Sequence, residues 1–364
     1  MNNQPILNKY WSSVCRHIDP YVPGEQPKGT KLIKLNTNES PYPPSPRVLE
    51  AIRNAASEDL RRYPDPFSDE LRKAAADYYG IGLKQIFVGN GSDEILAFCY
   101  LAFFNPGERI LFPDITYSFY PVYSKLFGIP YKEVALTRDF YVPIREFMTD
   151  NHGIIIPNPN APTGRFLDTD SLLTMVNYNL DCGKVIIVDE AYIDFGGDSL
   201  ISFINRFPNL LIVHTLSKSR SLAGLRIGLA FGSEGLIEGL FRIKNSFNSY
   251  PLDRLAIAGA AEAFRDREYF EETRGKIIRT REWIEKELAK IGFIVIPSKA
   301  NFLFVAHKNV SAADISSKLR EREIYVRHFK KPRIDNYLRI SVGSDEEMEF
   351  LLKNLREILG AYKG

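Results

Sequence analysis

Cysteine and histidine are scarce in this chain of 364 residues, and neither is spaced for cross-linking or metal binding. The three cysteines are odd in number, and no Cys-x-x-Cys spacing occurs, so neither a disulfide framework nor a zinc site is indicated. The five histidines show no His-x-x-x-His or His-Glu-x-x-His spacing. We therefore expect no structural or catalytic metal.

The chain also lacks long apolar runs and an excess of charge of either sign. Its longest apolar stretches are strand-sized, such as residues 185–188, and its first five residues lack the charged-then-apolar order of a signal peptide. Basic and acidic residues, 47 and 45 in number, leave a net charge of only +2. We expect a cytoplasmic protein that binds neither nucleic acid nor membranes.

The length favours two domains, because a single hydrophobic core stops growing below this size. Short apolar runs alternate with helical patterns through the middle of the chain, which indicates an α/β domain with a mainly parallel sheet. The expected strands are 85–88, 109–112, 153–156, 184–188 and 210–214, and the expected helices are 92–104, 117–127 and 171–180.

The last hundred residues follow another pattern. A long charged helix is expected over residues 266–290 and could bridge two domains. Strands at 292–296, 301–305, 324–328 and 337–342 and helices at 311–320 and 345–359 then indicate a small α+β domain. We expect an N-terminal arm and part of the small domain in residues 1–35, the large domain in 36–262, and the rest of the small domain, with the long helix, in 263–364.

One lysine and one carboxylate stand at the ends of neighbouring expected strands. Asp189 follows the strand 184–188 directly, and Lys218 follows the strand 210–214 within Thr-Leu-Ser-Lys-Ser-Arg. Open α/β sheets bind ligands at the carboxyl ends of their strands. A lysine that can form a Schiff base and a carboxylate that can pair with a pyridine nitrogen are what pyridoxal phosphate requires. Asp189 as a mere cap of the next segment is the alternative.

A phosphate group would need further donors, and three segments supply them. Gly91, Ser92 and Asp93 open an expected helix, where the glycine permits close approach and the helix N-terminus favours an anion. Ser217 and Arg226 would complete the phosphate site from the other side, since Arg suits bidentate phosphate contacts. A simple helix cap explains the Gly-Ser-Asp segment equally well by itself.

Three more polar or aromatic residues follow expected strands. Tyr117 could stack on the cofactor's face, although such aromatics are as often part of a core. Tyr192 and Asn160 could each hydrogen-bond the ring hydroxyl, although a half-buried aromatic and a plain turn explain them as well.

Taken together and in this order, the motifs of the chain resemble fold type I pyridoxal-phosphate aminotransferases, of the class that includes the histidinol-phosphate aminotransferases. The resemblance covers nearly the whole chain. The motifs that carry it are residues 35–41 (LNTNESP), 62–65 (RYPD), 91–94 (GSDE), 162–164 (PTG), 188–192 (VDEAY), 217–218 (SK), 224–228 (GLRIG) and 338–340 (LRI).

The resemblance implies the fold and several roles. The fold would be a large domain with a mainly parallel seven-stranded sheet plus a small α+β domain. Lys218 would hold pyridoxal 5'-phosphate as a covalent aldimine, Asp189 would be its pyridinium partner, and Tyr117 its stacking ring. Ser92, Ser217 and Arg226 would bind its phosphate. Tyr63 would reach the cofactor phosphate of a neighbouring subunit, which implies a homodimer with shared active sites.

Substrate choice rests on three further residues. Arg339 matches the family's arginine for a substrate anion, and Arg327 and Tyr21 match phosphate-binding residues of histidinol-phosphate aminotransferases. Two arginines and a tyrosine suit a dianion. The chain departs from the family at Ala161, where an asparagine commonly bonds the ring hydroxyl, and at Ser40, which replaces the second asparagine of Asn-Glu-Asn-Pro.

We therefore expect a transaminase of histidine biosynthesis that exchanges an amino group between L-glutamate and imidazole-acetol phosphate, giving 2-oxoglutarate and L-histidinol phosphate. A threonine-phosphate decarboxylase and an aromatic-amino-acid aminotransferase of the same fold are the alternatives within the enzyme class. A cofactor-sensing regulator would usually carry a DNA-binding domain, for which neither a leading segment nor a basic excess is present.

Overall fold

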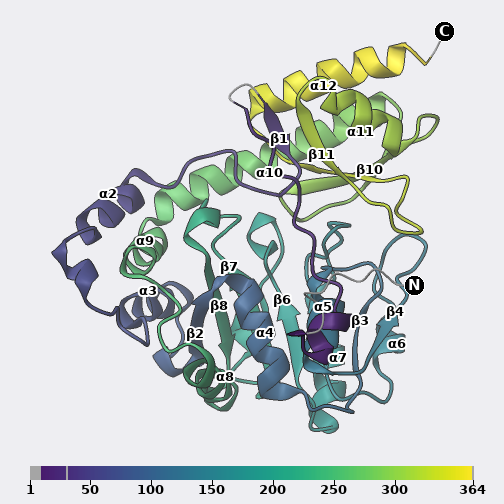
Figure 1. Cartoon of the computed structure of the whole chain (residues 1–364). Coiled ribbons are helices and arrows are strands. Elements are labelled where there is room, and N and C mark those ends of the chain that lie inside the picture. Colours follow the sequence, from purple (N-terminus) through teal and green to yellow (C-terminus); the bar gives the residue numbers. More distant parts are fainter. Residues whose placement is uncertain (1–9, 30–31, 363–364) are drawn as a thin grey trace.

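The computed structural model describes residues 10–29 and 32–362 (Figure 1). Residues 1–9, which include the segment tested for a signal peptide and the start of the expected N-terminal arm, lie outside the described residues. Within the described ranges, no helix is both long and apolar enough to cross a membrane.

A seven-stranded sheet forms the larger part of the molecule. Its strand order is β2-β8-β7-β6-β5-β3-β4, and all neighbours are parallel except β8, which runs antiparallel to both β2 and β7. The expected α/β fold with a mainly parallel sheet is confirmed. The strands are β2 (Ile86–Asn90), β3 (Ile110–Pro113), β4 (Tyr131–Val134), β5 (Ile154–Pro157), β6 (Ile186–Asp189), β7 (Leu210–Thr215) and β8 (Ile227–Gly232).

Helices cover both faces of this sheet, which explains why its central strands are apolar throughout. In β6, Ile186 and Val188 join one core cluster and Ile187 joins the other, as the two-residue period of a strand requires. The first cluster includes buried residues of α3, α7 and α9, and the second includes residues of α4, α5 and α8. These helices are α3 (Asp69–Tyr79), α4 (Gly91–Phe103), α5 (Phe119–Phe127), α7 (Thr169–Asp181), α8 (Glu234–Phe247) and α9 (Arg254–Arg265).

A second sheet of five strands lies above the first in Figure 1, in the order β1-β11-β12-β10-β9. Its strands are β1 (Ile33–Leu35), β9 (Phe293–Ile296), β10 (Phe302–His307), β11 (Ile324–His328) and β12 (Leu338–Ser341). It packs with α11 (Ala312–Arg320), α12 (Asp345–Gly360) and part of α10 (Arg267–Lys290). Because β1 pairs with β11 in parallel, a segment near the N-terminus is built into a sheet otherwise made from the C-terminal part of the chain.

The long helix α10 runs from beside α9 to the five-stranded sheet (Figure 1). It begins at Arg267, and Asp266 is its N-cap, whose side chain accepts a hydrogen bond from the Tyr269 amide. The helix expected at residues 266–290 therefore begins one residue later, because a cap residue lies outside the helical turn.

Several elements were not expected from the sequence. Strand β8 begins at the end of the 224–228 motif, in which only the phosphate role of Arg226 was considered. It is buried throughout, and β4 has a single buried residue, so neither shows an alternating strand period. Strand β1 and the helices α3, α8 and α9 were not expected either. The same is true of the shorter helical elements α1 (Ser13–His17), α2 (Pro46–Ala55), α6 (Ile144–Phe147), η2 (Glu58–Arg61), η3 (Leu83–Gln85), η4 (Ile193–Phe195), η5 (Leu200–Phe203) and η6 (Ala223–Leu225).

Candidate active site

A cavity of about 340 Å³ opens at the carboxyl ends of β5, β6 and β7 and reaches β11 and β12 of the smaller sheet. It is the place at which an open α/β sheet binds its ligand. Most of the residues expected from the sequence line it: Tyr21, Ser92, Asp93, Tyr117, Asp189, Tyr192, Ser217, Lys218, Arg226, Arg327 and Arg339.

Asp189 is the last residue of β6 and is almost wholly buried at the floor of the cavity. Its Oδ2 accepts a hydrogen bond from the Tyr120 hydroxyl at 2.8 Å, and its Oδ1 accepts one from the Ala191 amide at 3.2 Å. Burial raises the pKa of Asp189 to about 6, and the two hydrogen bonds oppose that rise. A positively charged partner would therefore be strongly attracted to this carboxylate.

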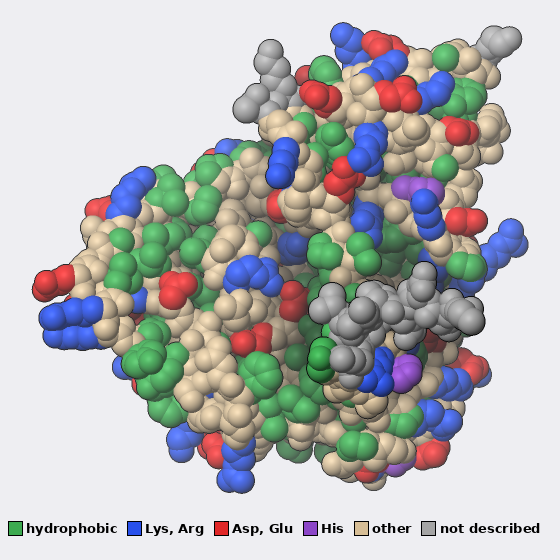
Figure 2. Space-filling view, viewed as in Figure 1, with side chains coloured by type: hydrophobic (Ala, Val, Ile, Leu, Met, Phe, Trp, Pro, Cys, Tyr) green, Lys and Arg blue, Asp and Glu red, His purple; other side chains and the backbone are tan. Residues whose placement is uncertain are grey.

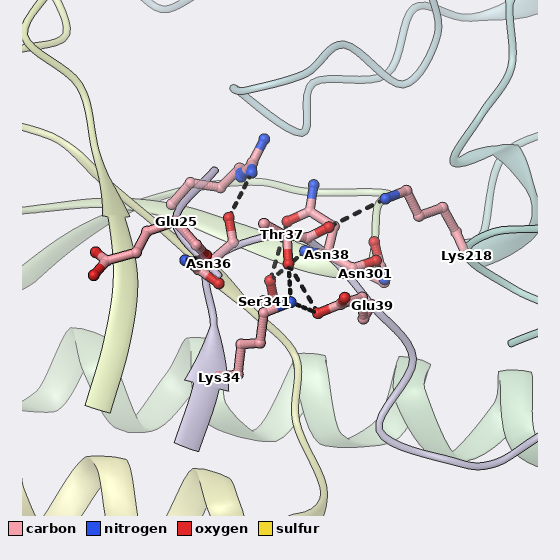
Figure 3. Close-up of polar contacts among 10 residues, drawn as sticks. Glu25, Lys34, Asn36, Thr37, Asn38, Glu39, Lys218, Asn301 and Ser341 are labelled. Carbon is pink, nitrogen blue, oxygen red and sulfur yellow. Dashed lines mark hydrogen bonds and ion pairs between the residues drawn. The ribbon is translucent and has the colours of Figure 1, made fainter. Parts of the chain in front are cut away.

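Lys218 lies in the loop after β7, and its Nζ donates a hydrogen bond to the Thr37 carbonyl oxygen at 3.1 Å (Figure 3). Burial lowers the pKa of the Lys218 amine to about 8, and the positive charge of Arg339 adds to this effect. A larger fraction of the amine is thus uncharged near neutral pH than for an exposed lysine, and only the uncharged amine is a nucleophile or base.

Tyr192 lies on the wall beside Lys218, with the Lys218 Nζ 5.9 Å from the centre of its ring. Its hydroxyl accepts a hydrogen bond from Asn38 Nδ2 at 2.9 Å. The hydroxyl proton stays available for a second, donated bond to a ligand.

The expected phosphate residues meet at the N-terminus of α4. Arg226 Nη2 contacts Asp93 Oδ2 at 3.0 Å, and Tyr117 donates from its hydroxyl to Asp93 Oδ1 at 2.7 Å. Gly91 has a φ of 78°, and a Cβ there would lie 2.5 Å from Arg226 Nη2. Only glycine at this position therefore lets the Arg226 guanidinium lie against the start of α4. The guanidinium and the helix N-terminus together form a basic recess that suits a phosphate.

Two arginines face each other at the opposite end of the cavity. Arg327 of β11 and Arg339 of β12 are direct partners in the antiparallel register. Arg339 Nη2 donates to the Asn36 carbonyl oxygen at 2.9 Å, while its Nε is buried without a hydrogen-bond partner. Within the part of the chain that the structure describes, neither arginine contacts a carboxylate. Like charges opposite each other on a sheet repel. An anion bound between the two guanidinium groups would offset that repulsion, so the pair favours binding of an anion.

Tyr21 comes from the N-terminal segment and lies near these arginines. Its ring stacks on Phe119 with centroids 4.1 Å apart, and its centroid is 6.3 Å from that of Tyr117. Burial raises the pKa of Tyr21, so its hydroxyl keeps its proton and can donate to an anion.

Three of the expected residues are not brought into the cavity. Asn160 is buried outside its lining: its Nδ2 donates to the Ile115 carbonyl oxygen and to Thr163 Oγ1, whereas Ala161 lines the cavity. Tyr63 is 80% exposed and stacks on Tyr250, with ring centroids 4.6 Å apart. Gly91 does not line the cavity either, but it directly precedes the lining residues Ser92 and Asp93.

Sequence reasoning missed several residues that contact the site. Thr37, Asn38 and Glu39 lie within a motif that had been noticed but given no role, and all three line the cavity. Tyr120 had been interpreted as part of a helix only, and its contact with Asp189 spans 69 positions of the chain. No local pattern signals such a contact.

The residues present fit pyridoxal phosphate. A lysine of lowered pKa, a buried carboxylate at the end of the neighbouring strand, and a glycine-permitted basic recess are the three groups that the cofactor requires. The described residues include no group of three or more His, Cys, Asp or Glu that could hold a metal ion.

Comparisons with known proteins agree with this chemistry. A histidinol-phosphate aminotransferase of Clostridium botulinum (strain Langeland / NCTC 10281 / Type F) is 56% identical over 353 residues, which cover 97% of this chain and 99% of the relative. A histidinol-phosphate aminotransferase 1 of Methylococcus capsulatus is 55% identical, with 97% and 98% covered.

Among solved structures, the histidinol-phosphate aminotransferase of Sinorhizobium meliloti in complex with pyridoxal-5'-phosphate superposes with a TM-score of 0.87. It is 24% identical and covers 97% of this chain and 98% of its own. At that identity the likeness concerns the fold. The family model of class I and II aminotransferases matches residues 30–355, and this chain belongs to that family.

Proposed function

We propose that the protein transfers an amino group between L-glutamate and imidazole-acetol phosphate, forming 2-oxoglutarate and L-histidinol phosphate in histidine biosynthesis. The names of the relatives at 55–56% identity support this reaction. The observation that carries it is the cross-strand pair Arg327 and Arg339, because two arginines that contact no carboxylate among the described residues match a phosphate dianion better than a single carboxylate.

Pyridoxal phosphate is the cofactor that these residues would hold. When bound, it supplies a carbonyl that condenses with amines and a ring that withdraws electrons from the substrate's α-carbon. Lys218 would hold it covalently, and Asp189 would pair with its ring nitrogen. Ser92, Ser217 and Arg226, together with the backbone at Gly91 and Asp93, would bind its phosphate, and Tyr117 would stack on its ring.

Lys218 has a second task in this proposal. Its Nζ, with a pKa lowered to about 8 by burial, can take the proton from the substrate's α-carbon and return a proton, as a general base and then a general acid. The Thr37 carbonyl oxygen orients this amine. Tyr192 would donate its hydroxyl proton to the ring hydroxyl. Asn160 is not needed for that contact, because Asn38 already orients Tyr192.

The anion end fixes the substrate. Arg339 would bind the anion of either donor, the phosphate of histidinol phosphate or the α-carboxylate of glutamate, and Arg327 and Tyr21 would add contacts to the phosphate. Phe329 and Tyr117 also line the cavity, and their rings would help to exclude water from the reacting amine once the ligands are bound.

A homodimer with shared sites forms part of this proposal. Hydrophobic side chains gather on the left of the view in Figure 2, over the part of the molecule that holds α2, α3 and α9. The stacked rings of Tyr63 and Tyr250 are solvent-exposed, as are Leu60, Phe67 and Phe247 from the same two segments of the chain. An exposed apolar cluster of this kind favours a protein partner, and we take it to be a second copy that receives Tyr63.

Two further expectations stay proposals. The division into domains at residues 35/36 and 262/263 is supported by the pairing of β1 with β11 in the smaller sheet. A cytoplasmic location is supported by the biosynthetic reaction proposed.

A single-turnover absorbance measurement tests the function. Protein loaded with pyridoxal phosphate is mixed with L-histidinol phosphate in one experiment and with threonine phosphate in another. We expect the absorbance band of the loaded protein to be lost with histidinol phosphate and to remain with threonine phosphate. Release of carbon dioxide from threonine phosphate would instead assign the chain to the decarboxylases, and no cofactor band at all would refute the proposal.

A further inference from the structure

Glu39 is a charged residue of the cavity wall to which the proposed reaction assigns no task. It follows β1 and lines the same cavity as Lys218 and Arg339. It is the third carboxylate there, after Asp93 and Asp189.

Neighbours hold only one oxygen of the Glu39 carboxylate (Figure 3). Lys34 Nζ forms an ion pair with Oε2, and Thr37 Oγ1 donates to the same atom at 2.8 Å. Among the residues that the structure describes, none donates a hydrogen bond to Oε1. A carboxylate oriented by two donors on one oxygen thus offers its other oxygen to a ligand.

The carboxylate is charged at neutral pH. Partial burial opposes ionisation, but the hydrogen bonds from Lys34 and Thr37 outweigh it and lower the pKa of Glu39. Its side chain is 42% exposed, so a ligand in the cavity can approach it.

The other two carboxylates are already engaged. Asp93 is bound by Arg226 and Tyr117, and Asp189 is bound by Tyr120 on the cavity floor. Histidinol phosphate carries a phosphate, an amine and an imidazole ring. The arginines match its phosphate and Lys218 its amine, so only the N–H of the ring still lacks a partner, and an N–H needs an acceptor.

We propose that Glu39 Oε1 accepts a hydrogen bond from the imidazole N–H of the substrate and so makes the enzyme select an imidazole ring. This inference rests on the proposed function. A phenyl ring has no N–H to donate, and glutamate has no ring. Glu39 would therefore lower the KM for histidinol phosphate and leave the KM for L-glutamate largely unchanged.

The test compares Glu39→Gln with wild type in the two half-reactions of the loaded enzyme. A neutral amide oxygen is a weaker acceptor than a carboxylate, so the KM for L-histidinol phosphate should rise roughly tenfold more than the KM for L-glutamate. Equilibrium binding of L-histidinol phosphate, measured by calorimetry with Lys218→Ala in both proteins so that no turnover occurs, should weaken by a similar factor.

Glu25→Gln is the matched control. Glu25 is 43% exposed and ion-paired with Arg320, but it does not line the cavity, and Figure 3 shows it turned away from Lys218. Its substitution should change neither KM.

Lys34→Met distinguishes the role of the Glu39 carboxylate from that of its ion pair. It removes the ion pair with Lys34 and keeps both the carboxylate and its hydrogen bond from Thr37. It should retain most of the preference for histidinol phosphate. The inference is refuted if Glu39→Gln changes both donors equally or neither, or if Lys34→Met loses the preference to the same extent. A wild-type enzyme that does not react with histidinol phosphate would refute the proposed function instead.

Discussion

At the scale of single residues, the site gathers groups whose protonation is shifted in opposite directions. Burial raises the pKa of the Asp189 carboxyl to about 6 and lowers that of the Lys218 amine to about 8. Both shifts arise because burial removes water from a charged group, which lowers the free energy of unfolding. A bound cofactor would compensate this cost, so the cofactor-free protein should be less stable than the cofactor-loaded protein.

Replacing Asp189 by Asn tests this cost. The folded-state pKa of about 6 lies above the ordinary value of 3.8, so between these values the folded protein holds more protons than the unfolded chain. Stability is then highest below that window and falls as pH rises through it, by up to about 3 kcal/mol. We expect cofactor-free Asp189→Asn to be more stable than wild type at neutral pH, to lose this pH dependence in urea unfolding, and to bind pyridoxal phosphate weakly.

The exposed Asp181→Asn should show neither effect and is the control. Equal stability of wild type and Asp189→Asn at every pH would contradict the assigned cost.

Replacing Tyr120 by Phe tests the hydrogen bond behind the carboxylate. The hydroxyl donates to Asp189 at 2.8 Å, so its loss should raise the pKa of Asp189 further and weaken its attraction for a ring nitrogen. We expect the dissociation constant of pyridoxal phosphate, measured by absorbance titration, to rise about tenfold. Tyr100→Phe, which removes a buried hydroxyl that donates to the Tyr120 carbonyl oxygen, should have a much smaller effect.

At the scale of elements, strands β11 and β12 carry the two arginines that we propose bind the substrate anion. Their register places Arg327 opposite Arg339, and β1 on the other side of β11 leads into the segment whose Asn36 carbonyl oxygen accepts from Arg339. The smaller sheet thus carries the anion end of the cavity, and the larger sheet carries Asp189 and Lys218.

Substitution of the two arginines should separate the two donors. Arg339→Ala should raise the KM for both L-histidinol phosphate and L-glutamate, because each presents an anion there. Arg327→Met should raise the KM for histidinol phosphate by roughly 10- to 100-fold and affect glutamate less, since the second arginine matches the second charge of the phosphate. Steady-state kinetics with each donor measure both effects.

Arg322→Met, which breaks an ion pair with Glu357 away from the cavity, is the control. If Arg327→Met raised both KM values alike, a specific role for Arg327 in phosphate binding would be excluded.

At the scale of the whole molecule, the active site lies between the two sheets, while Tyr63 points outward on the surface. A single chain therefore leaves one expected cofactor contact unmade. A second copy that supplies its own Tyr63 would complete the site.

Complementation tests this arrangement. Lys218→Ala and Tyr63→Phe should each be strongly impaired alone, with the fold intact by circular dichroism. Co-expressed, they should form mixed dimers in which one of the two sites is intact, with recovery of about a quarter of wild-type activity for random pairing. Lys218→Ala mixed with Asp189→Asn should recover nothing, because both residues line the cavity of one chain. Absence of recovery in the first mixture would refute shared sites.

The sequence by itself determined much of the architecture and pointed to residues that the fold brings into one cavity. Lys218, Asp189, Ser217 and Arg226, which the sequence predicts as cofactor residues, all line that cavity, and they could be singled out because a lysine, a carboxylate and phosphate donors form a specific chemical set. Periodicity likewise predicted the central parallel strands and α10, whereas β8 and β4 lack a clear period.

Only the tertiary structure decided which distant groups meet. Lys218 and Thr37 are 181 positions apart, and Asn38 and Tyr192 are 154 apart, so no local pattern relates them. The register that opposes Arg327 to Arg339 depends on the pairing of two strands, and Asn160 lies outside the cavity because Ile115 and Thr163 bind its side chain. Residues in short motifs can be identified from the sequence, because the motif itself indicates their chemistry. Hydrogen-bond partners far apart in the chain depend on how the strands and loops pack.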